Sequence, residues 1–170
     1  ILVGAAITGI QSNHIISTIK HFAFNDQETA RFTVDVHISE AAAHESDLLA
    51  FQIGIEKGHP GAVMCAYNVV NGYKACDSDW LLNKVLKQDW RYEGFVMSDW
   101  GAVPGLGTAL HGLDQQSAAP SDGAIYFGKP LAEAAARDPA YAARLDDMNK
   151  RILTSIYANG LDRYPPTPGG

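Results

Sequence analysis

Apolar residues along this chain gather in short unbroken runs, and segments with helical periodicity separate the runs. Three of the runs are Ile15–Ile19, Gly61–Ala66 and Gly94–Met97. A short apolar run bounded by turn residues is typical of a strand that is buried on both faces, as in a parallel sheet. Each run ends abruptly in polar or aromatic residues: Lys20-His21, Tyr67-Asn68 and Ser98-Asp99-Trp100.

The segments between and after these runs have the pattern of amphipathic helices. Ser39 can cap a helix through Ala41–Lys57, with Gly58 as its stop. Ser78 can cap a second helix, whose apolar face consists of Leu81, Leu82, Val85 and Leu86. A last helix, closed by Gly160, has apolar residues at three- and four-residue spacing: Leu145, Met148, Ile152 and Ile156.

Strands and helices therefore alternate through the middle of the chain, which predicts right-handed βαβ units and a parallel sheet. The number of residues between Tyr67 and Asp99 fits one βα unit of an eight-fold barrel, in which each unit has roughly 30 residues. Asn71-Gly72 predicts a tight turn. Apolar residues alternating with polar ones predict one half-exposed strand, from Phe32 through Val34 and Val36 to Ile38.

Composition narrows the class of protein. With 170 residues, 46% hydrophobic and 19% charged, the chain fits a single globular domain over residues 1–163. Residues 164–170, rich in proline and glycine, are typical of a linker or a frayed end. The net charge of −6 argues against a nucleic-acid or membrane partner, and no apolar stretch approaches the ~20 residues of a membrane span.

The two cysteines, Cys65 and Cys76, exclude a disulfide-rich scaffold and a four-cysteine zinc site. They form either one local bridge or two buried thiols, and we favour the thiols. None of the six histidines has the H-E-x-x-H spacing of a zinc site, and the glycines after Trp100 lack the order of a nucleotide loop. No G-x-S-x-G is present. We therefore expect neither a metal nor a cofactor.

The three strand ends point to a common site, because the carboxyl ends of parallel strands open on one face. There a carboxylate such as Asp99 can attack an anomeric carbon. Lys20 and His21 can donate to sugar hydroxyls, Tyr67 can donate to the carboxylate, and Trp100 can stack on a pyranose ring. Considered one at a time, each residue also has an ordinary structural explanation. Asp99 can cap a helix, Lys20-His21 can lie in a solvated loop, and Tyr67 and Trp100 can belong to the surface rim or the hydrophobic core.

Longer stretches at the same places resemble glycoside hydrolase family 3. They are Lys20–Arg31 (KHFAFNDQETAR), Val63–Gly72 (VMCAYNVVNG), Leu81–Trp90 (LLNKVLKQDW), Gly94–Ala102 (GFVMSDWGA) and Arg144–Leu161 (RLDDMNKRILTSIYANGL). The resemblance implies an α/β fold, a partial (β/α)8 TIM-type barrel that is incomplete at its N-terminal side. It further implies a retaining, exo-acting β-glycosidase for terminal β-D-glucosyl residues, or a β-xylosidase or N-acetylglucosaminidase.

The resemblance also implies roles for residues. Asp99 matches the nucleophile, and the residues that match sugar-binding positions are Lys20, His21, Tyr67 and Trp100. A motif that we interpret as supporting the loop is matched by Asn25, Glu28 and Arg31. Two places depart from the family pattern: Ala30 stands where an Asn is common, and Gln115-Gln116 replaces a more apolar, acidic stretch.

Other parts expected from the resemblance have no counterpart in the sequence. They are the first barrel strands, with an Asp and an Arg that hold the sugar, and a second α/β domain that carries the general acid/base Glu. We therefore expect a piece of a longer or split enzyme, inactive by itself, whose parent acts on a β-linked gluco-oligosaccharide or aryl glucoside. The family favours a periplasmic or extracellular parent. The alternative is a catalytically incompetent carbohydrate-binding or interaction fragment.

Overall fold

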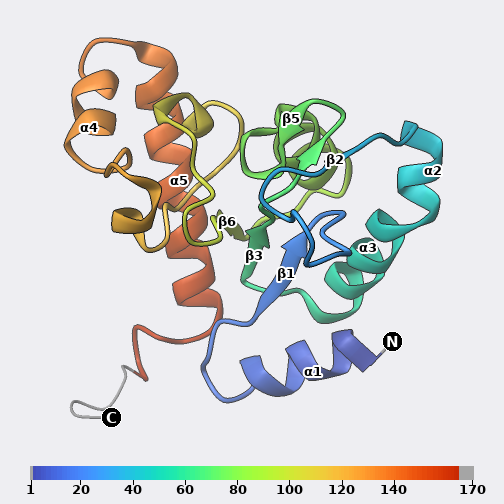
Figure 1. The fold of residues 1–170 in the computed structure, drawn as a ribbon. Helices are drawn as coiled ribbons and strands as arrows, with labels where there is room; N and C mark the ends of the chain where they lie inside the picture. Colours follow the sequence, from blue (N-terminus) through green and yellow to red (C-terminus); the bar gives the residue numbers. More distant parts are fainter. Residues whose placement is uncertain (1, 165–170) are drawn as a thin grey trace.

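The computed structural model describes residues 2–164, and a parallel sheet lies at its centre (Figure 1). The sheet contains β1 (Thr18–Phe22), β3 (Ala62–Cys65) and β6 (Phe95–Met97) in the order β1-β3-β6. Ile19 pairs with Val63, and Val63 in turn pairs with Val96. The predicted α/β fold with parallel strands is confirmed. The sheet does not close on itself, so the described residues form a partial barrel.

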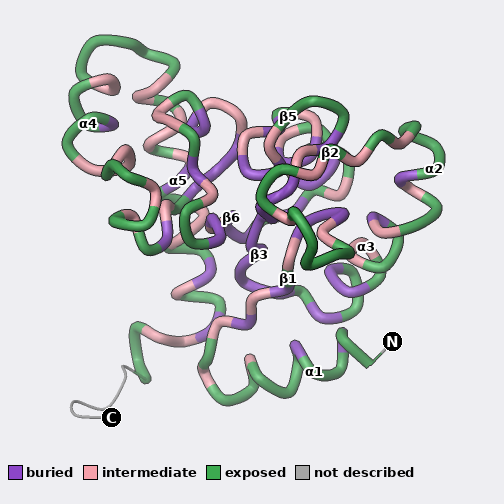
Figure 2. Tube along the Cα trace, viewed as in Figure 1, coloured by how far each residue is buried: buried purple, intermediate pink, exposed green. Residues whose placement is uncertain are grey.

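Strands β3 and β6 form where apolar runs are, because helices and loops cover both sides of them. The first run was predicted wrongly at both ends, since β1 begins three residues after Ile15 and continues through Lys20 and His21 to Phe22. All four residues of β3 are buried, as expected for the central strand of a covered sheet. The core extends from the sheet into the surrounding helices, whereas the outer surfaces of α1 (Leu2–Gln11) and α4 (Lys129–Ala135) are exposed (Figure 2). Figure 1 shows α1 below the sheet and α5 (Pro139–Ala158) beside β6.

The helix predicted over residues 41–57 is two helices, α2 (Glu40–Glu45) and α3 (Asp47–Gly58). Ser39 caps α2 as predicted, since its side chain accepts a hydrogen bond from the Ala42 amide. The break lies at Ser46, whose hydroxyl donates to the Ala42 carbonyl at 2.7 Å. A serine hydroxyl that competes for helix carbonyls in this way disturbs regular helix geometry. The stop is also one residue later than predicted, because His59 takes the left-handed conformation after Gly58.

The second predicted helix is present as η2 (Trp80–Asp89), a helix with π-type hydrogen bonding. Its four predicted apolar residues are all buried in the core. The Ser78 hydroxyl accepts from the Leu81 amide at 3.2 Å, so Ser78 bonds to the first turn as predicted, although Asp79 is the residue directly before the helix. The last predicted helix is α5; it buries Met148, and Gly160 follows it with a φ of 71°. Short 3-10 turns complete the chain: η1 (Ala75–Asp77), η3 (Leu106–Ala109) and η4 (Ala119–Asp122).

A second, smaller sheet lies beyond the carboxyl ends of the central strands (Figure 1). It contains β2 (Asp35–Val36), β4 (Val69–Val70) and β5 (Tyr73–Lys74). The tight turn predicted at Asn71-Gly72 joins β4 to β5. The prediction of a strand from Phe32 to Ile38 was wrong except at Asp35 and Val36, which form β2. The Ala30 carbonyl accepts from the amides of residues 33 and 34, which closes a turn where an extended strand was expected.

Cys65 and Cys76 form a disulfide, so the prediction of two buried thiols was wrong. Cys65 ends β3 and Cys76 follows β5, and the hairpin between them turns the chain back until the two Cα atoms are 5.0 Å apart. This separation lies within the range that a disulfide requires, and it could not be read from the sequence. No helix among residues 2–164 is long and apolar enough to cross a membrane. The tail predicted as a linker is residues 164–170, and all of it except Tyr164 lies outside the described residues.

Candidate active site

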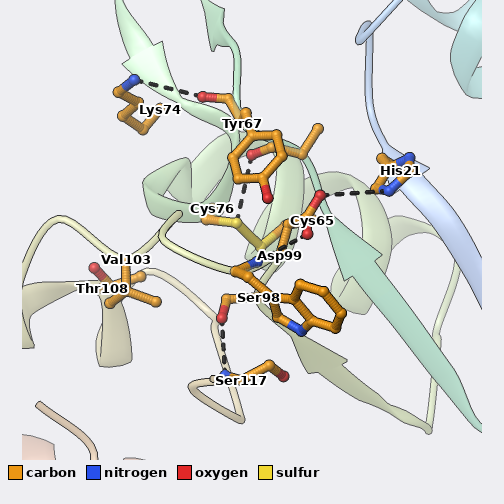
Figure 3. The surroundings of a disulfide bond; sticks show 12 residues. His21, Cys65, Tyr67, Lys74, Cys76, Ser98, Asp99, Val103, Thr108 and Ser117 are labelled. Carbon is orange, nitrogen blue, oxygen red and sulfur yellow. Dashed lines mark hydrogen bonds and ion pairs between the residues drawn. A yellow bond between two sulfur atoms is a disulfide. The ribbon is translucent and has the colours of Figure 1, made fainter. Parts of the chain in front are cut away.

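Asp99 lies two residues beyond the end of β6 and is 8% exposed. Its Oδ1 accepts a hydrogen bond from the Trp100 amide at 2.8 Å. The preceding residue, Ser98, is fully buried; its hydroxyl accepts from the Ser117 amide at 2.9 Å. The backbone on both sides of Asp99 is thus fixed, and the carboxylate faces His21 and Tyr67 at the carboxyl end of the sheet (Figure 3).

His21 lies within β1, one residue before that strand ends, and its Nε2 is 3.4 Å from Oδ2 of Asp99. Partial burial lowers the pKa of His21 below its ordinary value, while the Asp99 carboxylate acts in the opposite direction. A neutral imidazole can donate or accept through Nε2 according to its tautomer. The peptide bonds Lys20–His21 and Phe22–Ala23 are cis.

Tyr67 follows β3, the strand between β1 and β6, and its hydroxyl points toward Asp99 (Figure 3). Burial, followed by the neighbouring Asp99, raises the pKa of Tyr67, so the phenol stays protonated at neutral pH. The ring packs against Phe32 with centroids 4.5 Å apart. The Arg31 guanidinium lies 5.1 Å from the Tyr67 ring centroid, within the range of a cation–π interaction. Tyr67 is therefore held from several sides.

Lys20 and Trp100 differ from these three residues in their exposure. The Trp100 side chain is open to solvent, with 64% of its surface exposed. Lys20 is also exposed, and within residues 2–164 its ammonium group has no hydrogen-bond or ion-pair partner. The structure therefore brings together His21, Tyr67 and Asp99, and it leaves Lys20 and Trp100 as solvent-facing groups at the same edge.

The predicted supporting residues lie in the loop after β1. Arg31 forms an ion pair with Glu28 at 3.1 Å. The side-chain oxygen of Asn25 is buried without a hydrogen-bond partner among the described residues. Sequence reasoning did not select Asn68, which is fully buried and donates to the Ala23 carbonyl at 3.1 Å. Asn68 thereby ties the end of β3 to the end of β1, and its place next to Tyr67 was the signal available in the sequence.

Taken together, the side chains suit the chemistry of a polar, uncharged ligand with hydroxyl groups. A buried carboxylate can act as a nucleophile, and an imidazole, a phenol and an ammonium group can hydrogen-bond to hydroxyls. An exposed indole can cover an apolar ring face. Within the described part of the chain, no group of three or more His, Cys, Asp or Glu residues could hold a metal ion.

The chain is similar in sequence to curated beta-glucosidases. The chain is 47% identical over 116 residues to beta-glucosidase B of Emericella nidulans, covering 68% of this chain and 14% of that protein. It is 38% identical over 169 residues to a probable beta-glucosidase L of Aspergillus fumigatus, covering 94% of this chain and 22% of that protein.

Solved structures match the fold as well. A beta-glucosidase from Chaetomella raphigera superposes with a TM-score of 0.91 at 34% identity, over 97% of this chain and 23% of that one. Beta-glucosidase 3B from Thermotoga neapolitana, solved in complex with glucose, gives 0.83 at 33% identity, over 98% and 24%. The chain thus spans about a quarter or less of the length of these relatives.

The family model described as the glycosyl hydrolase family 3 N terminal domain matches residues 1–121, which include β1, β3, β6 and all the predicted site residues. With that match and these relatives, the chain belongs to glycosyl hydrolase family 3.

Proposed function

We propose that this chain supplies the nucleophile, Asp99, of a retaining β-glycosidase that removes terminal β-D-glucosyl residues. The observation that carries the proposal is the position of the Asp99 carboxylate at the carboxyl end of β6, 3.4 Å from His21 Nε2 and beside the Tyr67 hydroxyl. The substrate class follows from the relatives, which are described as beta-glucosidases.

The reaction proceeds in two displacements. An Asp99 oxygen attacks the anomeric carbon, the bond to the leaving oxygen breaks, and a general acid gives that oxygen a proton. The product of this step is a glycosyl ester on Asp99. Water then attacks the same carbon, a general base takes its proton, and the ester bond breaks to return the Asp99 carboxylate with retained anomeric configuration.

Neighbouring residues serve this nucleophile. The Trp100 amide holds Oδ1 of the carboxylate at 2.8 Å, and Oδ2 lies 3.4 Å from His21 Nε2. His21 and Lys20 donate to hydroxyls of the sugar in the glycone position, and the protonated Tyr67 donates toward the carboxylate or the ring oxygen. Trp100 offers its exposed indole to the apolar side of the pyranose ring.

The remaining parts of the site come from outside these residues. We expect the general acid/base to be a Glu on a second domain, about 5–5.5 Å from the Asp99 carboxylate, as in retaining enzymes. Further barrel strands are expected to hold the glycone. Since loss of general acid catalysis typically costs about 10²–10⁴-fold in rate, the 170 residues alone should not turn over a β-linked gluco-oligosaccharide or an aryl glucoside at an ordinary rate.

Trapping the intermediate tests the proposal in the protein that carries this chain. A 2-deoxy-2-fluoro-β-glucoside with a good leaving group should glycosylate the enzyme and leave a glycosyl ester that hydrolyses slowly, and peptide mass spectrometry should locate the sugar on Asp99. Asp99→Asn is the matched control, because it keeps the shape of the side chain and should take up no label. A label on another carboxylate would overturn the assignment of Asp99.

A further inference from the structure

A cluster of buried charges lies between η2, α5 and the loop that follows η3. Its centre is Asp114, whose side chain has no exposed surface. The Oδ1 atom of Asp114 accepts from Lys87 of η2 at 2.7 Å and from Arg144 of α5 at 2.5 Å. The Lys87 side chain is only 5% exposed. None of these residues belongs to the candidate active site.

Both cations also bind backbone carbonyls of the same loop. Lys87 donates to the Gly112 carbonyl at 2.6 Å, and Arg144 donates to the Leu113 carbonyl at 2.9 Å and, at the end of η3, to the Ala109 carbonyl at 2.7 Å. The loop is therefore attached through charged side chains to two helices that are far apart in the sequence. Such an arrangement fixes the position of the loop against both helices.

Stability alone is a weak reason for this cluster. Burial lowers the pKa of Lys87 to about 8 even though Asp114 acts in the opposite direction. The desolvation of Lys87 thus outweighs the attraction of its partner. A buried ion pair is often no better for stability than apolar side chains of similar volume, so a role in specifying geometry is the stronger explanation.

The geometry that the cluster fixes is that of the backbone leading to Asp99. The second carboxylate oxygen of Asp114 accepts from the Val96 amide in β6 at 2.7 Å. The Val96 carbonyl accepts in return from the amides of Asp114 and Gln115, at 2.9 and 3.0 Å. The Ser98 amide donates to the Gln115 carbonyl at 3.0 Å. Val96 and Ser98, two alternate residues before Asp99, are therefore both bonded to the segment that begins at Asp114.

We infer that Lys87, Asp114 and Arg144 are positioning residues, which hold β6 in the register that brings the Asp99 carboxylate against His21. Asp114 connects the two helices to β6, since one of its carboxylate oxygens binds Lys87 and Arg144 and the other binds the Val96 amide. The catalytic consequence of this inference rests on the proposed function; the positional part does not.

His21 provides a readout of position that needs no turnover. Its Nε2 is already close to Asp99, at 3.4 Å, so a displaced β6 lengthens this contact and removes the interaction that raises the His21 pKa. Displacement therefore lowers the His21 pKa. Loss of a nearby positive charge by itself would have the opposite effect and raise it, so the sign separates movement from simple electrostatics.

The decisive variant is Lys87→Met, which keeps the length of the side chain and removes its donors. The His21 pKa, followed by NMR of the imidazole protons, should fall in the same direction as in Asp99→Asn. Lys87→Arg should restore the wild-type value. Lys84→Met is the matched control on the same helix, because Lys84 forms an exposed pair with Asp89 and should leave His21 unchanged.

Should Lys87→Met fail to fold, Arg144→Lys supplies the same readout, because it keeps the charge and loses the paired bonds to the loop. An unchanged or raised His21 pKa in a folded Lys87→Met or Arg144→Lys variant would overturn the inference.

Kinetics in the protein that carries this chain separate the positioning role of the cluster from the proposed glycosidase function. If both are correct, Lys87→Met lowers kcat about 10-fold or more with little change in KM, because a misplaced nucleophile affects the transition state more than substrate binding. If His21 responds as predicted but no glycoside is hydrolysed by the wild type, the proposed function fails and the positioning role stands.

Discussion

Removing the Cys65–Cys76 disulfide should destabilise the protein by an amount that its loop length sets. The two cysteines are 11 residues apart in the sequence. Closing a loop of about a dozen residues removes unfolded-state entropy worth about 3 kcal/mol at 25 °C. Both sulfur atoms lie in the core, where Cys65 and Cys76 have no exposed surface. Alanine at both positions leaves only a small additional void, so the entropic contribution should dominate the loss.

Urea unfolding followed by circular dichroism measures this directly on Cys65→Ala/Cys76→Ala and on the wild-type chain. The midpoint should fall in the double variant and, to a similar extent, in the wild type treated with a reductant. The reductant should not change the double variant. A free energy of unfolding within about 0.5 kcal/mol of wild type, or two titratable thiols in the unreduced protein, would refute the reasoning.

Three further outcomes follow from the same contacts. Asp99→Asn should lower the His21 pKa further, because the Asp99 carboxylate raises it more than Glu28 does; an NMR titration in which the pKa rises or stays would contradict the contact between His21 and Asp99. Lys20→Ala should lower kcat/KM of the parent enzyme about 10–100-fold, the loss expected for one hydrogen bond to a charged donor, whereas the exposed Lys84→Ala should not. The pKa of Lys87 is about 8 in the folded protein and 10.5 ordinarily, so between these pH values the unfolded state binds more protons than the folded state. The free energy of unfolding should therefore increase as the pH rises from about 8 to 10.5, and Lys87→Met should abolish this increase.

Sequence reasoning succeeded where local chemistry determines the structure. The runs that became β3 and β6 are apolar because helices and loops cover them, and parallel pairing with β1 brings the polar residues at the carboxyl ends of the three strands to one edge. His21, Tyr67 and Asp99 could therefore be expected together before any contact was known. The caps at Ser39 and Ser78 were predictable for the same reason, since each depends on a hydrogen bond that spans three residues. The bounds of β1 were missed, because that strand extends through Lys20 and His21.

The features that sequence reasoning missed depend on distant partners. The cysteine pairing required a hairpin to return Cys76 to the end of β3, and the burial of Asn68 required the Ala23 carbonyl of another strand. Lys87 resembles any lysine on a helix, and only the fold places it against Asp114, 27 residues further on. Ser46 lies in a segment with good helical periodicity, where a local hydroxyl contact nevertheless breaks the helix.

The most direct test of the central claim is chemical rescue of Asp99→Gly in the protein that carries this chain. The variant should be inactive on 2,4-dinitrophenyl β-D-glucoside, whose leaving group needs no proton. Added azide, which fits the space of the missing carboxylate, should restore turnover and yield α-D-glucosyl azide, because it attacks the anomeric carbon from the face that Asp99 occupies. Unimpaired activity without azide, or rescue that gives the β-azide, would contradict Asp99 as the nucleophile.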